Sequence, residues 1–206
     1  MTSLKPGDMV KNRYRIIRQL DSGGWGTVHL AQDENLHLQV AIKSLKRRPD
    51  LEDYGQVCRL FEQEARISTR VDNHPNIIRV RDLVKDDYDL HLVMDYAEGG
   101  SLADRLKATG VLPIGEALDV SIALCQALDY AHRRGIVHAD VRPSNILLAV
   151  DKEITGEHIN YKLSDFGFAV DIQQQNEDED TSHLTVFDHR LAAIESRLIR
   201  RWSNVF

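Results

Sequence analysis

His138-Ala139-Asp140-Val141-Arg142-Pro143-Ser144-Asn145 is the stretch of this sequence that decides the fold. It places a carboxylate, a guanidinium and a side-chain amide close together in one short segment. Asp165-Phe166-Gly167 stands twenty residues after Asn145, beyond two predicted short strands. Three features precede both segments: a glycine-rich turn, a lysine in a predicted strand and a glutamate in a predicted helix. In this order, the five features form a set of charges suited to binding phosphate.

The glycine-rich turn is Asp21-Ser22-Gly23-Gly24-Trp25-Gly26-Thr27-Val28, between two predicted strands. Small residues in such a turn let backbone N–H groups approach a phosphate that a Cβ atom would keep away. Taken alone, the turn is weak evidence, because an ordinary hairpin has a similar composition. Its meaning depends on the charged residues that follow.

Lys43 and Glu64 are the first two of those charges. Lys43 lies in a predicted strand, whereas Glu64 lies between Leu60 and Ile67 on the apolar face of the predicted helix Gln56–Val71. A carboxylate on such a face is costly unless a partner neutralises it. We therefore predict an ion pair between Lys43 and Glu64, rather than a solvated strand lysine.

Together the five features resemble the ATP site of the protein kinases, and bacterial-type serine/threonine kinases in particular. The resemblance runs from about Tyr14 to Gly167, and Pro143-Ser144-Asn145 is similar to the serine/threonine branch rather than the tyrosine branch. It implies an α+β, two-lobe protein-kinase-like fold. We expect a complete small lobe and a truncated helical large lobe, because no Ala-Pro-Glu motif follows Gly167 in the chain.

The resemblance also implies a role for each site residue. Asp140 would accept the proton of a substrate hydroxyl, Arg142 would supply a cation to the transferring phosphoryl group, and Asn145 with Asp165 would hold Mg²⁺. The Lys43–Glu64 pair would bind the α- and β-phosphates. The residues implied in nucleotide binding are Gly23, Gly26, Val28, Ala41, Lys43, Asp95 and Ala97. The implied cofactors are ATP and Mg²⁺.

Two departures from the family pattern keep other functions open. Asp21 replaces the first glycine of the turn, which adds a negative charge near the nucleotide. Ala139 replaces the arginine that in the family docks a phosphorylated activation segment, so we do not expect phosphorylation there to be the switch. The first hypothesis is a serine/threonine protein kinase, with activity impaired by truncation. The alternatives are an ATP-binding pseudokinase or interaction module, and an inactive gene fragment.

The chain is predicted to divide into five segments. They are an N-terminal lead (1–13), the small lobe (14–97), a partial large lobe with the catalytic loop (98–170), an acidic mobile segment (171–183) and an amphipathic helical tail (184–206). Glu98-Gly99-Gly100 marks the predicted boundary between the lobes as a flexible crossing point. Before it, Ile77–Val84 is predicted to be a strand, and after it, Ser101 and Asp104 are predicted to form a capping box at the start of a short helix.

The tail carries apolar residues at intervals of three and four. They are Leu184, Phe187, Leu191, Ile194, Leu198 and Trp202. This period predicts an amphipathic helix over 184–202. The predicted helix 114–134 is apolar on several sides, so we expect the tail or a protein partner to cover it.

Composition restricts the partners and the compartment. The net charge of −6 disfavours nucleic acid and anionic membranes, and no apolar run is long enough to span a bilayer or form a signal peptide. We expect a cytoplasmic protein whose partners are ATP and a protein substrate bearing Ser or Thr. The two cysteines, Cys58 and Cys125, lie in helical apolar patterns and are expected to be buried free thiols.

Overall fold

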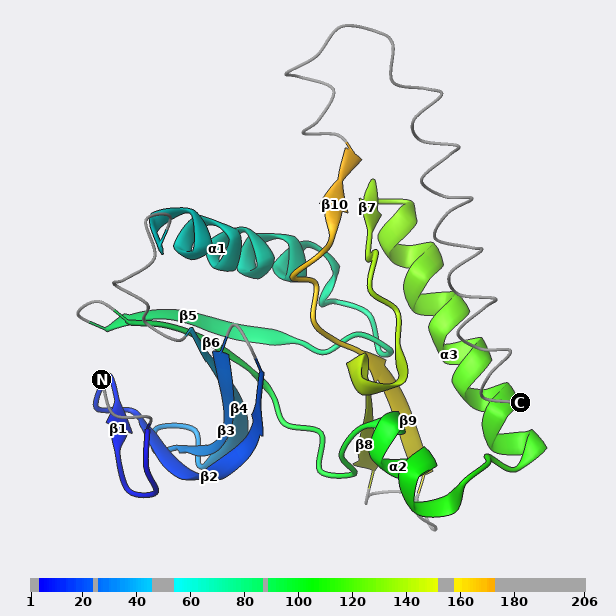
Figure 1. Ribbon diagram of the computed structural model, residues 1–206, viewed down its shortest axis with the longest axis horizontal. Coiled ribbons are helices and arrows are strands. Elements are labelled where there is room, and N and C mark those ends of the chain that lie inside the picture. The colour runs from blue at the N-terminus through cyan, green and yellow to red at the C-terminus, as the bar shows by residue number, and fades with distance from the viewer. Residues whose placement is uncertain (1–3, 24–25, 46–53, 87–88, 152–157, 173–206) are drawn as a thin grey trace, which may run out of the picture. The chain divides into compact units, whose positions relative to one another are not determined.

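A computed structural model of the chain describes residues 4–23, 26–45, 54–86, 89–151 and 158–172 (Figure 1). The chain divides into two compact units, one formed by residues 1–73 and 78–97 and the other by residues 74–77 and 98–206. The predicted tail 184–206, and all of the predicted segment 171–183 except its first two residues, lie outside the described residues.

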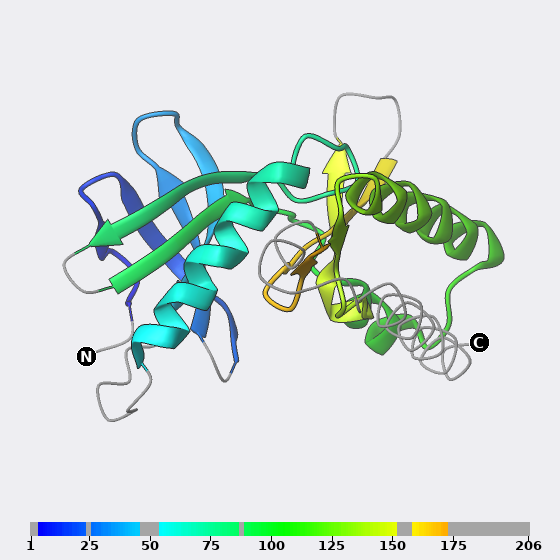
Figure 2. The same cartoon turned by 90° about the horizontal axis from the view of Figure 1, so that it is seen from above.

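A six-stranded antiparallel sheet forms the first unit, with α1 (Tyr54–Val71) lying across one of its faces (Figure 2). Its strands are β1 (Met9–Val10), β2 (Tyr14–Ser22), β3 (Gly26–Asp33), β4 (Leu38–Leu45), β5 (Val80–Asp86) and β6 (Asp89–Asp95). The strand order is β1-β2-β3-β4-β6-β5, so β4 pairs with both β3 and β6. This central position holds Lys43 between two neighbouring strands.

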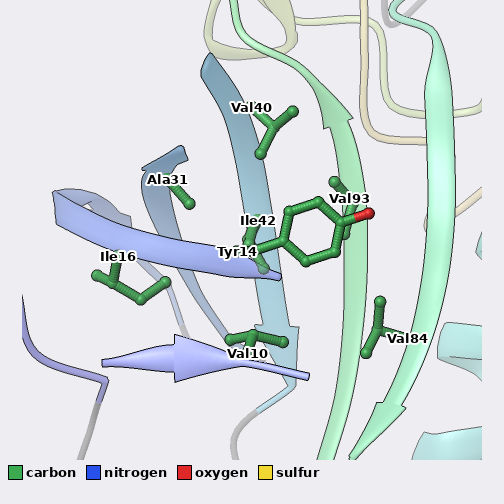
Figure 3. Packing of buried hydrophobic residues seen from close by; sticks show 8 residues of the cluster. All are labelled: Val10, Tyr14, Ile16, Ala31, Val40, Ile42, Val84 and Val93. Atoms are coloured by element: carbon green, nitrogen blue, oxygen red, sulfur yellow. The ribbon is translucent and has the colours of Figure 1, made fainter. Parts of the chain in front are cut away.

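The two faces of the sheet carry separate cores because side chains alternate along each strand. Val40 and Ile42 of β4 belong to a cluster that β1, β2, β3, β5 and β6 complete, and Figure 3 shows its eight buried members around Tyr14. Leu45, three residues after Ile42 and therefore on the opposite face, packs instead with Phe61 and Ala65 of α1. The alternation therefore places Lys43, like Leu45, on the face that α1 covers.

The structure corrects two predicted details in this part of the chain. Leu60 was expected on the buried face of the helix, but its side chain is 52% exposed, and α1 buries Phe61, Glu64, Ala65, Ile67, Ser68 and Val71 instead. A strand was expected from Ile77 to Val84, but β5 begins at Val80. Ile77 instead forms an isolated bridge with Leu163, within the second unit.

The second unit combines helices with short antiparallel strand pairs. Its elements are α2 (Leu102–Thr109), α3 (Ile114–His132), β7 (Ile136–Val137), the 3-10 helix η1 (Pro143–Asn145), β8 (Ile146–Asp151), β9 (His158–Leu163) and β10 (Val170–Asp171). β8 pairs with β9, and β7 pairs with β10. In the part of the chain described, no helix is long and apolar enough to cross a membrane.

Polar contacts fix the helices of this unit. The capping box predicted at Ser101 is confirmed, because the Ser101 side chain accepts from the Asp104 N–H and the Asp104 carboxylate accepts from the Ser101 N–H. The Glu116 carboxylate of α3 accepts two hydrogen bonds from Arg105 of α2, both 3.1 Å, and one from the Tyr161 hydroxyl of β9. One carboxylate thus joins three elements.

Gly99 and Gly100 were expected to form a flexible connection between the lobes, but backbone hydrogen bonds hold both residues in place. The Gly99 N–H donates to the Leu148 carbonyl at 2.8 Å, and the Leu148 N–H donates to the Gly100 carbonyl at 2.9 Å. A Cβ atom on Gly99 would lie 2.7 Å from the Leu148 oxygen, closer than packed atoms allow. This contact with β8 therefore requires glycine at position 99.

Gly26 permits a close contact between β3 and β4, and its replacement tests that contact. A Cβ atom at position 26 would lie 2.5 Å from the Ser44 carbonyl oxygen, whereas one at Gly23 would meet nothing within 4 Å. We predict that Gly26→Ala lowers the free energy of unfolding by about 1–3 kcal/mol. Gly23→Ala serves as the matched control and should change it by less than about 1 kcal/mol. Equal effects in urea unfolding would contradict this explanation.

Candidate active site

Lys43 and Glu64 form the ion pair that the sequence predicts. The Lys43 Nζ lies 2.6 Å from the Glu64 Oε1, and the two side chains are 19% and 6% exposed. Lys43 comes from the centre of β4, directly opposite Val28 on β3 and Leu92 on β6. Glu64 comes from the buried face of α1. The pair presents an ammonium group, anchored by a buried carboxylate, beside the strand that follows the glycine-rich turn.

That turn is held at its base by a hydrogen bond of 2.9 Å from the Gly23 N–H to the Gly26 carbonyl. Val28, the third predicted residue of this region, pairs with Lys43 across the two strands. Asp21, which was expected to add negative charge near the nucleotide, is exposed, and its carboxylate accepts from the Ser22 N–H at 2.7 Å. Gly26 has a packing reason for being glycine, independent of any phosphate.

Ala41, Asp95 and Ala97 were predicted to contact the nucleotide. Ala41 is buried in β4 opposite Met94 of β6, and Ala97 is buried just beyond the end of β6. The Asp95 side chain is paired with Arg81, and its N–H donates to the Arg79 carbonyl at 2.9 Å. Asp95 could therefore offer an adenine ring its carbonyl oxygen but not its N–H group.

The second unit brings Asp140 and Asn145 into direct contact. The Asn145 Nδ2 donates to the Asp140 carbonyl at 2.9 Å and to its Oδ2 at 3.0 Å. Asn145 is buried in η1, and its own N–H donates to the Arg142 carbonyl at 2.9 Å. The amide thus fixes both the backbone and the side chain of Asp140.

His138 and Ser164 are positioning residues to which the sequence analysis gave no role. The His138 Nε2 lies 3.0 Å from the Ser164 carbonyl, and the Asp140 N–H donates to the His138 Nδ1 at 3.3 Å. A carbonyl only accepts and a backbone N–H only donates, so Nε2 carries the proton, Nδ1 does not, and the ring is neutral. Burial lowers the pKa of His138, outweighing the opposing effects of the Ser164 carbonyl and of the Asp165 and Asp140 carboxylates. The signals were present in the sequence, since His138 stands two residues before Asp140 and Ser164 directly before Asp165.

Asn145 and Asp165 were predicted to hold a metal ion, and the orientation of Asn145 suits that role. Because Nδ2 is engaged with Asp140, the amide oxygen points away from that residue, and it accepts a hydrogen bond of 3.3 Å from the Ser144 hydroxyl. The Ser164 N–H and hydroxyl both donate to the Asn145 carbonyl, which brings the residue before Asp165 against Asn145. Two oxygen ligands leave the remaining positions around Mg²⁺ for phosphate and water.

The described residues contain no group of three His, Cys, Asp or Glu side chains that could hold a metal by themselves. A metal held by Asn145 and Asp165 would therefore need further ligands, such as phosphate or water oxygens. Arg142, the predicted catalytic cation, is exposed, and its Nε donates to the Ser144 hydroxyl.

The protein kinase domain model matches residues 14–189. The chain belongs to the protein kinase family. Both the family and the fold predicted from sequence are confirmed.

Among curated relatives, the chain is 37% identical over 164 residues to the serine/threonine-protein kinase PrkC of Bacillus subtilis. That match covers 79% of this chain and 24% of PrkC. The chain is also 34% identical to the serine/threonine-protein kinase PknB of Mycobacterium leprae, in a match that covers 78% of this chain and 25% of PknB. The crystal structure of the PknI kinase domain of Mycobacterium tuberculosis matches with a TM-score of 0.66 and 32% identity, over 82% of this chain and 64% of that one. The chain thus spans about a quarter of the length of these curated relatives.

The buried ion pair predicts strong energetic coupling between its members. Lys43→Met removes the cation beside a carboxylate that is 6% exposed, and should cost about 3 kcal/mol of unfolding free energy. In a double-mutant cycle with Glu64→Gln, we expect a coupling energy of about 1–3 kcal/mol. The Arg66–Glu62 pair on the same helix is the matched control. Arg66 is 76% exposed, and this pair should couple by no more than about 0.5 kcal/mol. Equal coupling in the two cycles would contradict the assignment.

Burial of neutral His138 predicts a pH dependence of stability. Because its folded pKa lies below the ordinary value near 6.5, the unfolded chain binds more protons as the pH falls below about 6.5. Its contribution is present above pH 6.5 and is lost below it. His29 and His74 have pKa values lowered by burial in the same way. His138→Gln, which keeps a donor and an acceptor, should reduce the slope of unfolding free energy between pH 5 and 6.5 by up to about 1.4 kcal/mol per pH unit. An unchanged slope would show that His138 is not buried as the neutral ring.

Proposed function

We propose that this protein transfers the γ-phosphoryl group of ATP to a Ser or Thr hydroxyl of a protein, with Mg²⁺ as the metal. The observation that carries the proposal is the fixed Asp140–Asn145 contact, in which one amide holds a carboxylate and directs its own oxygen away from it. This supports a base and a metal ligand positioned by one short loop. The names of the relatives support the substrate class.

Each residue of the chain has a separate task in this proposal. Lys43, kept in place by Glu64, would bind phosphate oxygens, and Asn145 and Asp165 would hold Mg²⁺, which neutralises charge on the phosphates when bound. Asp140 would orient the incoming hydroxyl and accept its proton. His138 holds the backbone of Asp140 through its N–H, so the carboxylate is positioned before the substrate arrives. The adenine base would be bound by the Asp95 carbonyl and the backbone of Ala97.

A second candidate, nucleotide binding without phosphoryl transfer, is favoured by one specific observation. Ala139 stands where the family carries an arginine, so the side chain that docks a phosphorylated activation segment is missing. Without that contact, a nucleotide-bound chain would act by presenting a surface to a protein partner. Binding and transfer must therefore be measured separately.

Binding and transfer should respond differently to two substitutions. At a concentration one hundred times its dissociation constant, ATP·Mg²⁺ should stabilise the chain by about 2.7 kcal/mol, seen as a rise in Tm. Lys43→Met should abolish this rise, because Lys43 contacts the phosphates in the bound ground state. Asp140→Asn should preserve the rise and abolish phosphorylation of Ser- and Thr-containing peptides.

The control is Asp129→Asn on α3. The Asp129 carboxylate is exposed, and among the described residues its ion-pair partner is Arg133, 3.0 Å away. Asp129→Asn should change neither the rise in Tm with ATP·Mg²⁺ nor the phosphorylation of the peptides. A rise in Tm without any transfer by the unmodified chain would support the second candidate. No rise at millimolar nucleotide in a folded sample would refute both.

A further inference from the structure

One face of α3 exposes a line of large apolar side chains. Ile114, Leu118 and Ile122 follow at intervals of four residues and are 82%, 58% and 55% exposed. Cys125, three residues further on, is also exposed, which corrects the expectation that both thiols are buried. Because residues three and four apart share one face of a helix, the four side chains form a single stripe along α3. We call these four residues the α3 stripe.

The α3 stripe is not the core face of the helix. The side that packs within the second unit buries Val120, Ala123, Leu124, Ala127 and Ala131. Single exposed apolar residues are normal on a protein surface, but an aligned set along one helix marks a surface that another element covers. An element that covers the α3 stripe must carry apolar residues at the same intervals, be about as long as α3 and lie within reach of it.

The described chain ends beside the C-terminal end of α3. β10 pairs with β7, which follows α3 directly, and the Ile172 N–H donates to the Gly135 carbonyl at 2.9 Å (Figure 1). Residues 173–183 follow this point and could span at most about 40 Å when fully extended. A helix over 184–202 would be about 28 Å long, the same length as the nineteen-residue α3.

The two apolar patterns mirror each other. Read from the C-terminal end of α3, the α3 stripe has intervals of three, four and four residues, from Cys125 to Ile114. The tail repeats these intervals in the forward direction: Leu191, Ile194, Leu198 and Trp202. An antiparallel helix would therefore place Leu191 at Cys125, Ile194 at Ile122, Leu198 at Leu118 and Trp202 at Ile114. A parallel helix in matching register would begin about ten residues before Ile114, beyond the reach of residues 173–183.

We propose that residues 184–202 dock on the α3 stripe as an antiparallel helix in this register. The tail thereby supplies the cover that α3 needs from the same chain, at the high effective concentration that a short connection provides. The proposal does not depend on the proposed function, because it concerns packing and requires neither nucleotide nor phosphoryl transfer.

A disulfide between the tail and α3 tests the register directly. In a Cys58→Ser background, Leu191→Cys leaves Cys125 as the only other thiol of the 206-residue chain. Mild oxidation of dilute full-length protein should give an intrachain disulfide, identified by mass spectrometry of proteolytic fragments. The matched control is Ser196→Cys, which five residues of helical rotation place on the far side of the tail. It should cross-link at least ten times more slowly. Equal rates, or disulfides only between chains, would overturn the proposal, the latter in favour of a second copy as the occupant.

A double-mutant cycle tests the same contact without cysteine chemistry. Leu118→Asp and Ile194→Asp should each lower Tm by about 5 °C, and the double variant should lose little more than either single one. The matched control is Leu36→Asp in the first unit, where the replaced side chain is 54% exposed, much like the 58% of Leu118. Leu36→Asp should change Tm little and add independently to Ile194→Asp. A silent Leu118→Asp, or strict additivity with Ile194→Asp, would show that the tail does not cover the stripe.

Discussion

The burial of the Glu64 carboxylate is the constraint on which the first unit depends. A carboxylate that is 6% exposed must be neutralised, and Lys43 provides the charge at 2.6 Å. Replacing both groups with apolar side chains would fill the same space at no such cost, so the pair is poorly explained by stability alone. The alternation of β4 sets Lys43 on the covered face, and the buried face of α1 brings Glu64 to it. Such a cost is expected if Lys43 binds phosphate as proposed, because its ammonium group would then have to be held still without being fully enclosed.

In the second unit, hydrogen bonds rather than regular secondary structure fix the reactive groups. The loop between β7 and η1 contains Asp140, and its geometry depends on buried His138 and buried Asn145, which hold it from its two ends. Ser164 links this loop to the segment leading to Asp165, because its carbonyl accepts from His138 and its hydroxyl donates to the Asn145 carbonyl. Asp140, Asn145 and the residue directly before Asp165 are thus parts of one hydrogen-bonded network. Removing any member leaves buried polar groups without partners.

The sequence predicted the features that depend on local pattern or on charge. The Lys43–Glu64 pair followed from the cost of burying a carboxylate, β4 from its alternation, and the Ser101 cap from the side chains needed at a helix start. It did not predict features that depend on contacts between distant segments. Ile77 joins β9 rather than β5, and the two-residue strands β7 and β10 are too short for any periodicity to show. Leu60 and Cys125 fit apolar helical patterns as well as their buried neighbours do, yet Leu60 is exposed and so is Cys125. Only the element that packs against each helix decides which of its apolar residues are buried.

Two of the five described residues other than glycine that have a positive φ angle lie at this network. Ala139 and Asp165 have φ angles of +62° and +64°, in the left-handed region that costs a residue with a Cβ atom roughly 1 kcal/mol or more. Asp tolerates this region well, but Ala has no polar side chain to compensate. The strain at Ala139 persists because its neighbours on both sides are fixed, His138 by the Ser164 carbonyl and Asp140 by Asn145. A loop selected only for stability would carry glycine at this position or would relax. The retained strain therefore agrees with a demand on the position of Asp140, the residue proposed to accept the proton of the hydroxyl.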